Sequence, residues 1–118
     1  MIKVKKVFDA KGNEVKQYIL VKGDSFRFKA NIKTSSEEEI VKKIVFKVAS
    51  NDFVQVFSKD FIKVENDWFL IVNSNETKEF AIGDYVTEIE VTYIDDGNDT
   101  VERSKLKVIN EIEEVDND

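Results

Sequence analysis

The sequence predicts an all-β fold, an antiparallel β-sandwich of about seven strands preceded by an N-terminal hairpin or arm. Two observations carry this prediction. Apolar and polar residues alternate over short runs, the pattern of half-buried strands, and turn-forming residues separate these runs at intervals of about eight to twelve positions. We expect three parts: an N-terminal hairpin or arm at residues 1–22, a β-sandwich domain at residues 23–109 and an acidic flexible tail at residues 110–118.

The N-terminal segment combines lysines with apolar residues. The two alternate over residues 2–8, and the polar run 9–13 turns the chain back into a second strand at residues 15–21. After Tyr18 this return strand is apolar at consecutive positions, so it is either covered on both faces or changes its pairing partner there. The segment is a candidate arm for packing on a neighbouring molecule.

The clearest alternation in the chain follows a Gly-Asp turn and covers residues 26–33. Its aromatic and aliphatic side chains fall on one face and its cations on the other, which predicts a strand packed on the core. The polar run 34–39 contains Ser36 and Glu39 at the spacing of a capped helical turn. Because the residues after it alternate at period two, we interpret the run as a loop.

Three further strands precede the only tryptophan. In residues 43–48, Ile44, Phe46 and Val48 alternate with Lys43, Val45 and Lys47, and residues 54–57 and 61–64 form two shorter apolar runs. Each run ends in Ser, Asn or Asp residues, which favour turns because their side chains hydrogen-bond to the nearby backbone.

The stretch from Trp68 onward organises the rest of the sandwich. Residues 68–72 are a continuous apolar strand, and the polar run 73–77 turns the chain. We expect Phe80 and Ile82 to close this corner from below. The strand at residues 85–93 follows, and we expect the two strands to be neighbours in an antiparallel arrangement.

A tight turn at residues 95–99 leads to the last strand, at residues 100–109. The turn contains several Asp and Asn side chains, but their order lacks the alternate-residue spacing of a calcium loop, so no metal site is expected. Seven large side chains are expected to hold the core: Phe26, Phe28, Phe46, Trp68, Leu70, Tyr85 and Ile89.

Charge is divided unevenly along the chain. Residues 1–33 carry nine Lys or Arg against three Asp or Glu, a balance of +6, and residues 34–118 carry nine against twenty-one, a balance of −12, which together give the net charge of −6. Basic and acidic strands that pair within one sheet would explain the split. The alternative is a basic face on one protomer that meets an acidic face on the next. The candidate contact residues are Lys3, Lys5, Lys6, Lys11 and Lys16.

The composition argues against several classes of function. The chain has no His and no Cys, so the commonest general base and the commonest activated nucleophile are both missing, and we expect no enzyme and no cofactor. The negative total opposes nucleic-acid binding, and no apolar run approaches the roughly 18 residues of a membrane span, so a membrane partner is not expected either. An exposed Trp68 would indicate a carbohydrate-binding module, but its place in the apolar run 68–72 favours the core.

Four motifs, in order along the chain, resemble one known family. These are the turn and strand entry at residues 22–26, the strand at 44–48, the corner and strand at 75–91 and the closing strand at 103–108. Together they are similar to the immunoglobulin-like N-terminal β-sandwich of phage baseplate upper proteins and related tail-fibre connector domains. The resemblance covers about residues 19–109. Ser104 departs from it, because the family often has Gly there.

The resemblance implies a non-enzymatic structural module of a phage or prophage virion, assembled in the bacterial cytoplasm. Such a module would be a baseplate, tail or fibre connector protein or a decoration protein. It would act through protein–protein contacts with other virion proteins and form a homo-oligomer. An alternative from another class is a small acidic phage-encoded inhibitor of a host nucleic-acid-binding enzyme.

Overall fold

Strands account for nearly all the regular structure of the residues that the structure describes. The computed structural model describes residues 3–8, 14–30, 40–65 and 67–110, and for residues 3–8 and 14–16 it describes the backbone alone. The elements in these ranges are β1 (Lys3–Phe8), β2 (Glu14–Val21), β3 (Phe26–Ala30), β4 (Val41–Ser50), β5 (Gln55–Asp60), β6 (Ile62–Val64), β7 (Asp67–Val72), α1 (Ser74–Thr77), β8 (Gly83–Tyr93) and β9 (Asn98–Ile109).

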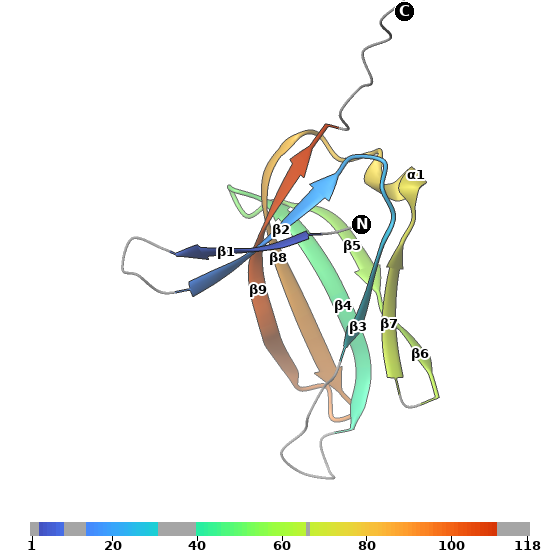
Figure 1. The fold of residues 1–118 in the computed structure, drawn as a ribbon. Helices are drawn as coiled ribbons and strands as arrows, with labels where there is room; N and C mark the ends of the chain where they lie inside the picture. Colours follow the sequence, from blue (N-terminus) through green and yellow to red (C-terminus); the bar gives the residue numbers. More distant parts are fainter. Residues whose placement is uncertain (1–2, 9–13, 31–39, 66, 111–118) are drawn as a thin grey trace, which may run out of the picture.

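The strands form two sheets that pack face to face (Figure 1). One sheet has the strand order β1-β2-β9-β8-β4-β5 and the other has the order β3-β7-β6. From β3 onward this is the strand order of an immunoglobulin-like sandwich, with β5 in the place of the additional strand of variable-type domains. The all-β sandwich predicted from the sequence is therefore confirmed.

One strand pair departs from the predicted antiparallel arrangement. The β2 strand runs parallel to β9, with Gln17 opposite Lys105 and Val21 opposite Ile109, whereas the other paired strands are antiparallel. The reason is the turn after β2, which sends β3 into the other sheet. Because β3 lies in the other sheet, β2 does not pair with it. Instead β2 pairs with the edge of β9 and runs in the same direction as β9.

The N-terminal hairpin is continuous with the larger sheet. The β1 strand pairs with Glu14 to Ile19 of β2, and β2 pairs with β9 from Gln17 onward, so the outer part of the hairpin extends beyond the sandwich (Figure 1). Tyr18 and Leu20 are buried in the core. The β2 strand therefore contributes directly to the sandwich interior.

Alternation on each strand fills the space between the sheets. Ile44, Phe46 and Val48 of β4 are buried and face Phe26 of β3, whose ring centroid lies 6.0 Å from that of Phe46. Of the seven predicted core residues, Phe26, Phe46 and Leu70 are buried, and the other four are partly buried and pack against them at the margin of the core: Phe28, Trp68, Tyr85 and Ile89.

The corner after β7 differs from the prediction in two ways. The β7 and β8 strands are not neighbours, because the chain crosses from the small sheet to the large one through α1. Phe80 is buried as expected, but Ile82 is 49% exposed, since it follows the point where the chain has left the core. The Tyr85 hydroxyl donates a hydrogen bond to the Ala81 carbonyl at 2.5 Å, the tyrosine corner of immunoglobulin-like domains.

Hydrogen bonds fix the helical turn α1 at both its first and its last residues. Asn73 accepts the Glu76 N–H at 3.0 Å, and the Glu76 carboxylate accepts the Asn73 N–H at 3.2 Å, which is a capping box. Thr77 is buried, and its hydroxyl oxygen accepts the Gly23 N–H at 3.1 Å. The turn before β3 and the corner after β7 are therefore fixed to each other.

Candidate functional site

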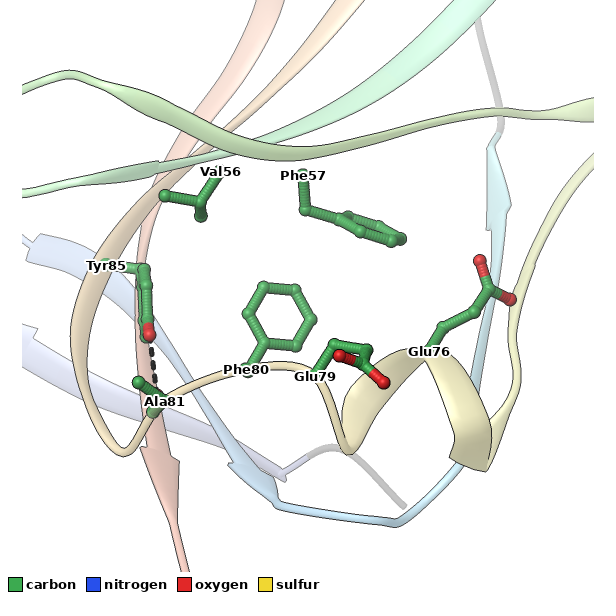
Figure 2. Close-up of a pocket in the computed structure, with 7 residues that line it drawn as sticks. All are labelled: Val56, Phe57, Glu76, Glu79, Phe80, Ala81 and Tyr85. Atoms are coloured by element: carbon green, nitrogen blue, oxygen red, sulfur yellow. Dashed lines mark hydrogen bonds between the residues drawn. The ribbon is translucent and has the colours of Figure 1, made fainter.

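A pocket of about 230 Å³ lies between β5 and the corner that follows α1 (Figure 2). Three aromatic rings form most of its floor, with centroids 5.2 Å apart for Phe57 and Phe80 and 5.7 Å apart for Phe80 and Tyr85. The residues that line it are Val56, Phe57, Glu76, Glu79, Phe80, Ala81 and Tyr85. The pocket is thus an apolar hollow beside an edge strand.

A β-bulge in β5 creates the upper wall of this pocket. Val48 pairs with Phe57 and Ala49 pairs with Gln55, so Val56 is an additional residue in the ladder. A regular strand would place Val56 and Phe57 on opposite faces, but both side chains point from β5 toward Phe80 (Figure 2). The bulge therefore aims two apolar side chains into one hollow.

Two carboxylates stand at the rim. Glu76 accepts a hydrogen bond from Lys59 Nζ at 2.5 Å as well as the Asn73 N–H. Burial alone would raise the pKa of Glu76, but the hydrogen bonds from Lys59 and Asn73 and the charge of Lys59 together lower it. Glu79 is exposed, and among the described residues no side chain pairs with its carboxylate. The rim is suited to a cation, and the floor to an apolar group.

The main chain of β5 offers hydrogen-bonding groups at its open edge. Within the described residues no strand pairs with β5 on the side away from β4. The Phe61 N–H donates to the Ile44 carbonyl at 2.8 Å, and antiparallel pairs alternate between exchanging hydrogen bonds and not. Lys59, two residues earlier, therefore turns its N–H and C=O toward β4, and Ser58 turns its own outward. An added strand can bond to Ser58.

The outer face of the large sheet has a second hollow, of about 260 Å³. Its charged side chains are engaged across strands, Lys47 with Glu90 at 3.1 Å and Glu88 with Arg103. Phe53 lies at its margin with a φ of 61° and is 69% exposed. Because its charges are already paired, this hollow has less to offer a ligand than the pocket beside β5.

A partly buried polar cluster joins β2 to β9. The Tyr18 hydroxyl donates a hydrogen bond to the Glu102 carboxylate, which also accepts the Ser104 hydroxyl at 2.9 Å. Burial, and then the hydrogen bond and charge of Glu102, raise the pKa of Tyr18 to about 12. Each polar group has a partner here, so the cluster is structural.

The structure places four of the five predicted contact lysines on the N-terminal hairpin. Lys3, Lys5 and Lys6 belong to β1 and Lys16 to β2, where Lys6 and Lys16 are opposite each other in the register. Lys11 lies outside the described residues. Their role in a partner contact stays a prediction.

Most ion pairs among the described side chains join residues within the acidic part of the chain. Lys29 pairs with Asp67 at 3.6 Å and so joins the basic part to the acidic part, and both groups are about half exposed. The other ion pairs lie within residues 34–118.

Other site classes find limited support in the described ranges. There, no three His, Cys, Asp or Glu side chains come together as a metal site would require. No helix in the same ranges is long and apolar enough to cross a membrane. Trp68 is partly buried and packs against the core, and Lys63 Nζ lies 5.8 Å from its ring centroid.

Comparison with protein-family models, curated proteins and solved structures finds no match for this chain.

Sequence reasoning did not find the pocket beside β5. The apolar residues Val54, Val56 and Phe57 indicated a strand, but alternation gave no sign that the last two share one face, because the bulge depends on pairing with β4.

Proposed function

We propose that this protein is a non-enzymatic structural module that works through protein–protein contacts in a phage or prophage virion. The observation that carries the contact function is the open edge of β5 with an apolar pocket and an acidic rim beside it. Edge strands present unpaired main-chain groups, and natural proteins cover or block them unless a partner uses them.

The sandwich suits such a role because it positions this surface rigidly. The capping box and the tyrosine corner fix the segment that supplies Glu79 and Phe80, and aromatic contacts join that segment to β5. A preorganised surface loses little conformational entropy when a partner binds.

The virion setting rests on the resemblance of residues 19–109 to the N-terminal sandwich of phage baseplate upper proteins and tail-fibre connectors. Within that setting the partners are other virion proteins and further copies of this chain. The basic N-terminal residues Lys3, Lys5, Lys6, Lys11 and Lys16 are proposed to meet an acidic neighbour, which fits a net charge of −12 over residues 34–118.

Quantitative mass spectrometry of purified phage particles, induced from the native source, tests this proposal. The expected result is a copy number of this protein in constant ratio to the tail or capsid proteins across preparations. Detection only in the cytosol of induced cells would refute the virion role. It would favour the acidic inhibitor instead, which a host nucleic-acid-binding enzyme recovered with the protein would support.

A further inference from the structure

We propose that β1 of one copy adds to the open edge of β5 of the next copy, so that the large sheets of successive molecules join edge to edge. This inference rests on the proposed function, since it specifies the self-association of that module. The two strands are the terminal strands of the six-stranded sheet, on opposite edges. Each copy therefore has one donor edge and one acceptor edge.

Both edges are single short strands. Both β1 and β5 are six residues long, and each pairs with a neighbour on one side alone within the described ranges. Strand addition gains its affinity from main-chain hydrogen bonds, such as those available at Ser58, and its specificity from pockets beside the edge.

The sequence of β1 fits the chemistry of the acceptor. Its residues are Lys-Val-Lys-Lys-Val-Phe, three cations among three apolar side chains. The acceptor offers an apolar floor and the carboxylates of Glu76 and Glu79, of which Glu79 has no partner among the described side chains. Lysines on an edge strand oppose pairing with most other strands, because their charges would be buried without partners. An acidic rim beside the acceptor edge supplies those partners and so favours pairing with this strand.

Charge also decides between this arrangement and a symmetric one. A two-fold dimer that paired β5 with β5 would bring two acidic rims together, and one that paired β1 with β1 would bring six lysines together. Like charges across an interface oppose association. The head-to-tail arrangement avoids both conflicts, and a head-to-tail contact builds a ring if its rotation closes and a filament if it does not.

Sedimentation velocity of the full chain over a range of concentrations tests the contact. Ser58→Pro removes the outward N–H of the acceptor without touching a hydrogen bond to β4, whereas the matched control Ser58→Ala keeps that N–H. We expect Ser58→Pro to weaken self-association by about tenfold or more and Ser58→Ala to leave it within about twofold. Glu79→Lys, which leaves the backbone unchanged, should weaken it to a similar extent, and more strongly at low salt.

A mixing experiment distinguishes a head-to-tail contact from a symmetric one. The donor-defective variant carries Lys3→Glu, Lys5→Glu and Lys6→Glu together, and the acceptor-defective variant is Ser58→Pro. Each should remain monomeric alone, and the mixture should form a 1:1 complex that cannot grow, because each variant keeps one intact edge. Circular dichroism and thermal unfolding of each variant confirm that it is folded before mixing.

The proposal is overturned if the unsubstituted chain is monomeric at every concentration, if folded Ser58→Pro and Glu79→Lys associate as strongly as the unsubstituted chain, or if the mixture forms no complex. None of these results bears on the virion role, which particle composition decides independently. A chain found in particles but monomeric in solution would thus reject the contact and retain the proposed function.

Discussion

Replacing Tyr18 with Phe isolates one hydroxyl at the junction between the N-terminal hairpin and the sandwich. Tyr18 is 7% exposed, and its ring packs edge-on against Phe28 with the centroids 5.4 Å apart. Its hydroxyl donates to Glu102 and has its pKa raised to about 12, first by burial and then by that carboxylate. Folding therefore favours the neutral phenol.

The sign and size of the pH effect follow from this pKa. Below about pH 10 the phenol is protonated in both the folded and the unfolded chain, so its contribution to stability is fully present. Between pH 10 and pH 12 the unfolded phenol ionises more than the folded one, so the stability falls as the pH rises. With about 1.36 kcal/mol for each pH unit, and with the folded phenol half ionised at pH 12, the loss reaches roughly 2 kcal/mol there.

The assay compares the free energy of urea-induced unfolding of the unsubstituted chain and Tyr18→Phe from pH 9 to pH 12. Lysine deprotonation affects both proteins alike, so the difference between them reports the phenol. We expect that difference to decrease by about 2 kcal/mol over this range. The phenolate absorbance lost in Tyr18→Phe should have its midpoint near pH 12. A difference that does not change with pH, or a midpoint near pH 10, would refute the reasoning.

Three further outcomes are expected in chemical denaturation at pH 7. Tyr85→Phe removes the hydroxyl of the tyrosine corner and should lower the free energy of unfolding by about 0.5–1.5 kcal/mol. Phe46→Ala empties the centre of the core and should cost roughly 3–5 kcal/mol, while Phe53→Ala, exposed, should stay within about 0.5 kcal/mol. Glu76→Gln should lower the free energy of unfolding by about 0.5–1.5 kcal/mol. The folded state lowers the pKa of Glu76, so the carboxylate stabilises the fold fully above its pKa in the unfolded chain and loses this contribution as the pH falls through its pKa in the folded chain. The difference in stability between the unsubstituted chain and Glu76→Gln should therefore diminish in acid.

Alternation predicted the sandwich because it is a local property. The residues of β3 and β4 that the sequence assigned to the core face are those that the structure buries or packs against it, since a strand has only two faces. The tight turn after β8 was likewise predictable from Asp95 and Gly97, whose N–H bonds to the Asp95 carboxylate at 2.9 Å.

Which strands pair was not predictable in the same way. The corner after β7 was expected to return the chain to a neighbouring strand, but the same polar residues can equally form a helical turn that carries it to the other sheet. The parallel pairing of β2 with β9 joins segments more than 80 residues apart, with Leu20 opposite Val108, and no local pattern encodes it.

The bulge at Val56 also limits how a partner strand can pair with β5. The bulge interrupts the regular spacing of main-chain N–H and C=O groups at the start of β5. A partner strand therefore finds regularly spaced groups only from Phe57 onward. A slip of one residue along the edge would exchange the face of β1 that carries Val4 and Phe8 for the face that carries Lys3 and Lys5. The same irregularity that opens the pocket therefore also restricts the register in which a strand can be added beside it.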